Sequence, residues 1–248
     1  GMLIPLVVPA DIPLWMVAVA TAFAVIFGKE VFGGTGMNIW NPALIARAFL
    51  FFAYPSKISG DTVWYSNCVD GFTGPTALSL AGTGDYTTYS IMDCIIGNIP
   101  GSIGETSVIA IGLGAILLLV TGIASWKTMF SVIAGGAIMG WVFNNFGSAD
   151  NAMAILPWYQ HLIIGGFAFG AVFMATDPVT SPRTECAKYI YGFLIGAMAI
   201  IIRVLNPGYP EGMMLAILLM NTLAPLFDYF VIQKNISKRK NRVKTAKA

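Results

Sequence analysis

The chain has 248 residues, of which 56% are hydrophobic and only 10% are charged, and its formal net charge is +2. This composition excludes an ordinary soluble domain, in which charged residues make up about a quarter of the total. Nothing in the sequence suggests nucleic-acid binding, because the basic residues near the C-terminus are explained by membrane orientation and anionic lipid. The 27 glycines suit close helix packing in lipid. We therefore expect an all-α polytopic membrane protein, with residues 1–248 forming a single transmembrane helical domain.

Long apolar segments recur along the chain. A helix that crosses a bilayer needs roughly 20 predominantly apolar residues, and several segments approach this length. The pattern predicts about six to seven membrane-spanning or half-spanning helices. In chain order they cover residues 12–28, 41–54, 105–123, 127–145, 159–176, 187–204 and 212–233.

The basic residues gather in the C-terminal tail, residues 234–248. The loops expected on the opposite side, 55–104, 146–158 and 205–211, contain a single basic residue, Lys57. Because cytoplasmic loops carry an excess of Lys and Arg, we expect a cytoplasmic tail and a periplasmic 55–104 loop, in a multi-pass protein of the bacterial inner membrane. Residue 1 then starts outside, so we expect a preceding N-terminal helical region in the full-length protein.

Two stretches are too polar or too rich in turn residues to continue a membrane helix. Residues 33–42 read Gly-Gly-Thr-Gly-Met-Asn-Ile-Trp-Asn-Pro, and Asn41 followed by Pro42 is typical of a helix start. Residues 176–182 read Thr-Asp-Pro-Val-Thr-Ser-Pro. Both are expected at cytoplasmic ends of helices. Paired breaks indicate an internal binding site, whereas ordinary cytoplasmic loops with turn residues are the alternative.

Residues 70–76 carry a short motif, Asp70-x-x-Thr73-Gly74-x-Thr76. It resembles the pattern Asp-x-x-(Ser/Thr)-Gly-Ala-Thr, at whose last threonine bacterial flavin transferases attach FMN through a phosphoester. The departure is Pro75, where the pattern has alanine. The alternative is a Gly-Pro turn in which Thr76 caps the next segment.

The resemblance extends over nearly the whole chain. Together with the flavin motif, residues 28–36, 41–44, 47–55, 58–61 and 173–180 resemble the latter part of the NqrB subunit of the sodium-translocating NADH:quinone reductases, the Nqr complexes. A sister family, the RnfD subunit of the Rnf ferredoxin:NAD reductases, shares the flavin and Thr-Asp-Pro motifs. The Phe-Phe-Ala-Tyr-Pro run that ends at Pro55, and the Ser-Gly-Asp that follows, favour the quinone reductase.

The resemblance implies a helical bundle like that of urea transporters, five partner subunits and a flavin transferase. It also implies an electron path from NADH, through covalent FMN on Thr76 and then riboflavin, to a quinone. Because the hydrocarbon core is about 30 Å thick, an outer FMN needs an intermediate carrier to reach the inner side. Asn38, Asn41 and Asp177 are the candidate riboflavin ligands, with cap or turn residues as the alternative.

Two acidic residues are candidates for the Na⁺ path that the family implies. Asp228 lies in the last apolar helix, and Glu30 lies at the mouth of the first break. Ionisable residues at such depth usually face an interior pathway, although Asp228 at the water interface is the alternative. Arg203 is expected to extend to the interface, with the FMN phosphate as its other possible partner. His161 is expected to be structural.

The same features leave two other assignments open. No metal site is predicted, because the three cysteines lack metal-ligand spacing; Cys68 and Cys94 share one loop and could pair. Broken helices with Asn-Pro turns also suit a channel or transporter for a small solute. Covalent flavin distinguishes the redox subunit from the channel.

Overall fold

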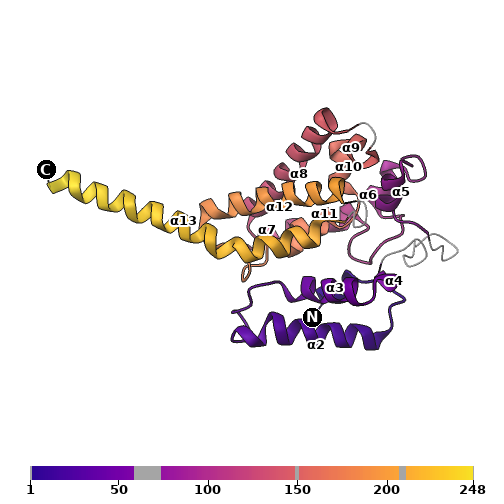
Figure 1. Cartoon of the computed structure of the whole chain (residues 1–248), viewed down its shortest axis with the longest axis horizontal. Helices are drawn as coiled ribbons and strands as arrows, with labels where there is room; N and C mark the ends of the chain where they lie inside the picture. The colour runs from indigo at the N-terminus through magenta and orange to yellow at the C-terminus, as the bar shows by residue number, and fades with distance from the viewer. Residues whose placement is uncertain (1, 59–73, 149–150, 207–210, 248) are drawn as a thin grey trace.

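The computed structural model describes residues 2–58, 74–148, 151–206 and 211–247. Within these residues the chain is built from helices and loops, without β-strands, which confirms the predicted all-α class. The motif residues Asp70 and Thr73, and also Cys68, lie outside the described residues. The elements shown in Figure 1 are α1 (Leu3–Leu6), α2 (Leu14–Gly28), the 3₁₀ turn η1 (Glu30–Phe32), α3 (Pro42–Ala53), α4 (Pro55–Ile58), α5 (Ala77–Thr83), α6 (Ile91–Ile96), α7 (Val108–Val120), α8 (Trp126–Phe146), α9 (Ala152–Ile155), α10 (Trp158–Ile163), α11 (Phe167–Phe169), the π-helical turn η2 (Gly170–Met174), α12 (Glu185–Leu205) and α13 (Met213–Lys247).

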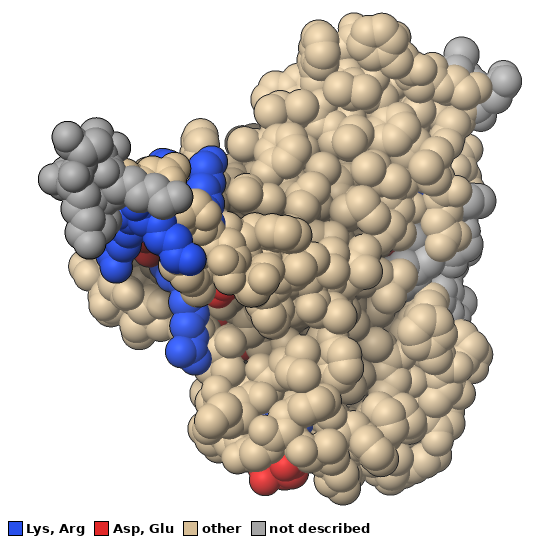
Figure 2. Space-filling view, turned by 60° about the vertical axis from the view of Figure 1, so that its left-hand side comes forward, with Lys and Arg blue, Asp and Glu red and all other residues tan. Residues whose placement is uncertain are grey.

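Four helices in the described part of the chain are long and apolar enough to cross a membrane. They cover 14–32, 126–146, 185–205 and 213–242, and the shorter helices α3 and α7 are also apolar. Large apolar side chains on them remain exposed, such as Val120 and Phe130, as expected for surfaces that face lipid. Charged atoms are sparse in Figure 2, where the blue Lys and Arg side chains gather mainly beside the C-terminal end. The molecule is therefore a polytopic membrane protein.

The long helices pack in two groups. Helices α2 and α3 make an antiparallel pair along one side, and α8, α12 and α13 pack together on the other (Figure 1). Glycines allow α8 and α12 to approach closely: a Cβ at Gly196 would lie 2.0 Å from the Val132 carbonyl oxygen, and one at Gly135 would lie 2.2 Å from the Phe193 oxygen. Close backbone contact at small residues is how membrane helices associate without a hydrophobic driving force.

Two predicted helices differ from the structure. Residues 159–176, predicted as one helix, are interrupted at 164–166, where Gly165 has φ +68°. The sequence predicts that the last helix ends at residue 233, but α13 continues through the basic stretch to Lys247, with Pro225 inside it. Basic side chains lack the apolar pattern of a membrane span, yet Lys and Arg are good helix formers, so the helix continues beyond the apolar segment.

Both predicted breaks are non-helical. Gly33, Gly34 and Gly36 all have positive φ, between 91° and 113°, a conformation that L-residues rarely adopt. Turns occupy residues 175–180 in the second break. In the 55–104 region, the described residues form α4, α5 and α6.

Candidate functional site

Thr76 stands at the start of α5. As N-cap, its side-chain oxygen accepts a hydrogen bond from the Ser79 amide at 3.1 Å. The neighbouring Gly74 is buried, whereas Thr76 is only half-buried. The capping role that the sequence leaves as an alternative is therefore present. Thr76 remains partly exposed while it caps the helix.

The first break is held to the last long helix by a side-chain bond. Asn41 caps α3 by accepting from the Ala43 amide at 2.9 Å, with Pro42 at the first helical position. The Asn38 amide donates to the Trp40 carbonyl oxygen at 3.4 Å. Trp40 Nε1 in turn donates to Thr222 Oγ1 of α13 at 2.9 Å. The predicted cap is confirmed, and the break lies against α13.

The second break lies near α12, and α12 in turn bonds the neighbouring residue of α13. Asp177 accepts from the Val179 amide at 3.1 Å in a tight turn, and its carboxylate acts electrostatically on Tyr191 of α12. The buried Tyr191 hydroxyl donates to Asn221 Oδ1 at 2.6 Å. Asn221 and Thr222 are adjacent, so one short segment of α13, here called the polar junction, bonds Trp40 of the first break and Tyr191 of α12.

The polar junction and the second break each hold a buried polar atom without a protein partner. Among the described residues, Nδ2 of Asn221 and Oγ1 of Thr180 make no hydrogen bond. Asn221 is 1% exposed and Thr180 is 4% exposed. A buried, unpaired polar group costs about 1 to 3 kcal/mol, so an unpaired donor beside a polar turn is a position where a bound polar molecule gains a partner.

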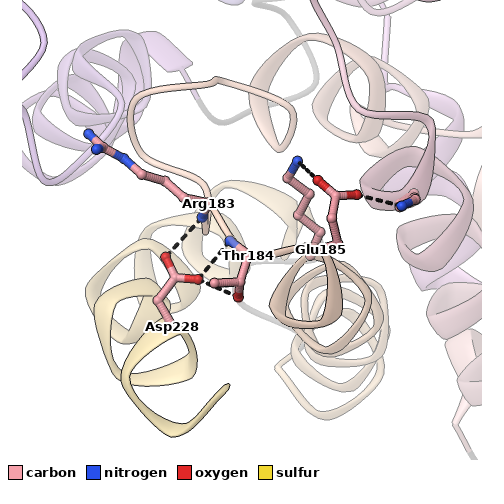
Figure 3. Close-up of polar contacts among 6 residues, drawn as sticks. Arg183, Thr184, Glu185 and Asp228 are labelled. Carbon is pink, nitrogen blue, oxygen red and sulfur yellow. Dashed lines mark hydrogen bonds and ion pairs between the residues drawn. The ribbon is translucent and has the colours of Figure 1, made fainter. Parts of the chain in front are cut away.

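Asp228 of α13 bonds the segment that leads into α12. Its carboxylate accepts from the amides of Arg183 and Thr184 at 2.8 and 2.9 Å, and from Thr184 Oγ1 at 2.6 Å (Figure 3). The adjacent Glu185 points the other way, where it pairs with Lys127 and with Lys188 at 2.7 Å (Figure 3). Asp228 therefore holds the N-terminal end of α12 as well as being a candidate ion ligand.

Glu30 lies apart from Asp228. Its side chain is 56% exposed, in the turn η1, and its nearest basic partner is Lys29, whose Nζ lies 3.7 Å away. The described contacts do not bring Glu30 and Asp228 together.

The sequence interpretation missed a buried ionic cluster that joins α3 to the segments before α7 and α13. Arg47 of α3 donates to Glu105, which precedes α7, and to Glu211, which precedes α13. The Arg47 side chain is 4% exposed. Both carboxylates border the interruption in the fifth apolar segment, since a Cβ at Gly166 would lie within 3.1 Å of each. An arginine in the middle of the apolar helix at 42–53 was the available signal.

Arg203 belongs to the same region, and the expectation that it extends to the interface is wrong. It is 1% exposed and donates to the carbonyl oxygens of His161 and Ile164, at 2.6 and 3.4 Å. Those carbonyls are left without helical partners by the interruption after Ile163, so the guanidinium satisfies backbone groups inside the protein. His161 is fully buried.

Comparison with known proteins assigns the class. The model of the NQR2, RnfD, RnfE family matches residues 1–237. Two proteins named as the subunit lettered B of Na(+)-translocating NADH-quinone reductase are 54% and 53% identical over 98% of this chain, from Pseudoalteromonas atlantica and Chromohalobacter salexigens, covering 61% and 59% of their own lengths. One of the same name from Pseudomonas aeruginosa is 53% identical over 96% of this chain and 60% of its own length.

The fold and the match agree. The chain is a polytopic helical membrane protein with two non-helical breaks, the first of which is bonded to the long helix α13. It belongs to the NQR2, RnfD, RnfE family. The chain spans about 60% of the length of the curated relatives it matches, and the predicted family resemblance is confirmed.

Proposed function

We propose that this chain is the flavin-carrying membrane part of a sodium-translocating NADH:quinone reductase. In this proposal FMN is attached to Thr76, riboflavin binds between the two breaks, and electrons pass from the first to the second and then to a quinone, coupled to outward Na⁺ transport. The observation that carries the proposal is the 53–54% identity, over 96–98% of this chain, to proteins named as a subunit of such a reductase. These relatives also favour the quinone reductase over the Rnf complex.

The outer flavin rests on the motif and on the position of Thr76. Thr76 is the N-cap residue of α5 and is half-buried, two residues after the buried Gly74. A phosphoester on this oxygen links the cofactor by its phosphate and leaves the redox ring free for the protein to tune. We propose that Asp70, Thr73 and Gly74 are the recognition residues for a flavin transferase.

The inner flavin rests on the junction on α13. A flavin needs hydrogen-bond partners for its polyol and its ring edge, inside otherwise apolar walls. Asn38, Asn41 and Asp177 supply amide and carboxylate groups from the two breaks, and Thr222 and Asn221 of α13 bond Trp40 of the first break and Tyr191 of α12. The unpaired Asn221 amide donor fits an acceptor on such a ligand. When bound, the two flavins supply the electron transfer, and the chain holds and orients them.

The ion path, the partners and the orientation complete the proposal. Asp228 and Glu30 are the proposed Na⁺-path residues. The active assembly contains five other subunits, which hold the NADH site. We place the C-terminal end of α13 in the cytoplasm and Thr76 on the periplasmic side of the bacterial inner membrane, supported by the basic residues at the end of α13 (Figure 2).

One experiment tests the covalent flavin. The chain is co-expressed with a flavin transferase and run on a denaturing gel, which keeps only covalent flavin. A fluorescent band is expected that disappears in Thr76→Ala and persists in Thr83→Ala, a matched change at the exposed end of the same helix. Absence of the band in the unchanged chain contradicts the assignment and favours a channel or transporter.

A second measurement tests the inner flavin. The assembled complex is extracted under denaturing conditions, and the released flavins are identified by chromatography. Riboflavin is expected in the extract, whereas covalent FMN stays with the protein. An extract without riboflavin removes the inner flavin from the proposal while leaving Thr76 in place.

A further inference from the structure

Helices α8 and α12 begin side by side at the same face of the membrane. Lys127 in the first turn of α8 pairs with Glu185 in the first turn of α12, and deeper in the pair a Cβ at Gly196 would meet the Val132 carbonyl oxygen. The two helices therefore run parallel. Each has 21 residues, about 32 Å at 1.5 Å per residue, which matches the hydrocarbon core. Their first turns accordingly lie at the level of the lipid headgroups.

An exposed aromatic pair stands at this level. The rings of Trp126 and Tyr189 meet edge to face with their centroids 6.3 Å apart, and both side chains remain exposed. Lys127 Nζ lies 5.9 Å from the centroid of each ring. Trp and Tyr concentrate where hydrocarbon meets headgroups, and a lysine ammonium is attracted to aromatic faces. The start of α8 and α12 therefore has the composition of a membrane–water interface.

The charges at this position do not cancel. Lys127 and Lys188 share one carboxylate, that of Glu185 (Figure 3). Two positive charges face one negative charge, so one positive charge is left over. The Asp228 carboxylate does not neutralise it, because it bonds the segment before α12 instead (Figure 3). Glu185 is 58% exposed, and exposed ion pairs contribute little stability, so both lysines are able to bind a further anion.

Exposed apolar side chains continue from the lysines toward the membrane interior. On α8, Trp126 is followed at i+4 and i+7 by Phe130 and Ile133, and on α12, Tyr189 is followed at i+4 by Phe193. All five side chains are exposed, and their spacing places each set on one face of its helix. Phe130 and Phe193 lie about 6 Å deeper than the interfacial rings. Cations above apolar faces match a molecule with an anionic head and hydrocarbon chains.

We propose that the start of α8 and α12 binds one anionic phospholipid. Its phosphate bonds the ammonium groups of Lys127 and Lys188, and its acyl chains lie along the exposed faces of the two helices. Basic groups between membrane helices are known to bind such headgroups. A zwitterionic lipid carries its own cation beside the phosphate, so it gains less from the excess positive charge. The inference is independent of the flavins, because it needs only the membrane fold.

Photo-labelling of the complete complex in phosphatidylcholine nanodiscs tests the site. The probes are phosphatidylglycerol and phosphatidylcholine with the same photoreactive acyl chain, each added as a minor component, and the labelled peptides are identified by mass spectrometry. Phosphatidylglycerol is expected to label residues 126–133 and 185–193 about fivefold more than phosphatidylcholine does, because each nearby lysine contributes an attraction of that size. Excess inorganic phosphate is expected to leave this labelling unchanged.

Two variants change the local charge in opposite directions. Lys188→Gln removes the excess positive charge and is expected to lower labelling by phosphatidylglycerol about fivefold. Glu185→Gln removes the internal anion and is expected to raise it. Lys238→Gln, at an exposed position of α13, is the matched control and is expected to change neither. If the ion pairs serve only to hold the helices together, labelling moves in the same direction in the first two variants.

The remaining outcomes are decisive as well. Equal labelling by the two lipids in the unchanged complex overturns the anionic site and leaves a general lipid-facing surface. Absence of labelling by either lipid also overturns it, since a partner subunit then covers these helix faces. Loss of labelling in excess phosphate assigns the lysines to a free anion. If a variant fails to assemble, the comparison of the two lipids in the unchanged complex decides.

Discussion

Arg47, in the middle of α3, donates a hydrogen bond to Glu211, which lies 164 residues further along the chain at the start of α13. The same guanidinium donates to Glu105 ahead of α7. One buried arginine therefore ties the α2–α3 pair to two segments of the other helices. Burial raises the pKa of Glu211, and the charge of Arg47 opposes that rise.

Removal of Arg47 is expected to destabilise the fold. In Arg47→Leu, two carboxylates remain in a largely buried site without their cation, and breaking a buried pair in this way costs about 3 to 5 kcal/mol. The thermal unfolding of the detergent-solubilised complex measures the loss. Lys57→Leu, which removes an exposed cation just beyond α3, is the control. Equal melting temperatures in the two variants would contradict a structural role for the cluster.

The contact between α8 and α12 makes a second prediction. In Gly196→Ala, the new Cβ would lie 2.0 Å from the Val132 carbonyl oxygen, so the helix backbones must separate. Overpacking of this kind typically costs about 1 to 3 kcal/mol. Gly112→Ala on α7 is the matched control, since no atom lies within 4 Å of its Cβ position. Thermal unfolding is expected to fall for Gly196→Ala and to hold or rise for Gly112→Ala, because alanine favours helix.

The turn between α5 and α6 depends on the ionised carboxylate of Asp85. Hydrogen bonds from Thr88 and Thr87 lower the pKa of Asp85 from 3.8 to about 2. Because the pKa is lowered, the ionised Asp85 stabilises the turn fully above about pH 4, and this stabilisation is lost as the pH falls through about 2. The protection of these two threonine amides against hydrogen exchange is therefore expected to stay constant from pH 8 down to about 4.

The same turn can be tested at neutral pH. Asp85→Asn removes the charge that both threonine hydroxyls and amides address, so exchange at the two amides is expected to accelerate at pH 7. Asp11→Asn, at another exposed position, is the control. If exchange at Thr87 and Thr88 is the same in both variants, the carboxylate does not order the turn.

The junction on α13 leads to a prediction about the inner flavin. Asn221→Leu keeps the branched shape but removes the amide that pairs with Tyr191 and carries the free donor. Riboflavin recovered from the purified complex is expected to fall about tenfold, as a lost hydrogen bond of about 1.4 kcal/mol implies. Thr222→Val, which removes the acceptor of the Trp40 bond and the donor to the Leu218 carbonyl oxygen but leaves Asn221 in place, is expected to lose less. Full riboflavin content in Asn221→Leu would remove the junction from the site.

Local chemistry explains which parts of the fold the sequence predicts. Asn41 before Pro42 is a cap signal that acts over two residues, and the structure has that cap. The interruption at Gly165 and Gly166 lacks such a signal, because glycines inside an apolar run are also typical of packed membrane helices. Its cause lies elsewhere in the chain, where Arg203 satisfies the freed carbonyls of His161 and Ile164.

The candidate site likewise has residues that the sequence predicts and contacts that it does not. Motif residues such as Thr76, Asn41 and Asp177 are recognisable because their spacing is local, although their binding roles stay predictions. The pairing of Arg47 with Glu105 and Glu211 spans 58 and 164 residues, and tertiary packing alone sets it. Asn221 looks like an ordinary polar residue of an apolar helix until α12 and α13 are placed together.

Variants of Asp228 distinguish a structural role of this residue from a role in Na⁺ transport. Asp228→Ala removes the acceptor of three hydrogen bonds at the start of α12, and both the melting temperature and the Na⁺-dependent turnover of the complex are expected to fall. Asp228→Asn keeps an acceptor oxygen but loses the charge. One of the two backbone amides then loses its acceptor, so the melting temperature is expected to fall, but by less than in Asp228→Ala. If the carboxylate takes part in Na⁺ uptake, Asp228→Asn also needs more Na⁺ for half-maximal turnover.

Thr184→Val completes the comparison, because it deletes the hydroxyl that donates to Asp228 at 2.6 Å while the carboxylate remains. It is expected to lower the melting temperature slightly and to leave the Na⁺ dependence unchanged. Unchanged Na⁺-dependent turnover in Asp228→Ala would show that Asp228 is not on the ion path. A Na⁺ dependence that shifts equally in Thr184→Val and Asp228→Asn would instead trace the effect to the position of α12, since only one of these variants alters the charge.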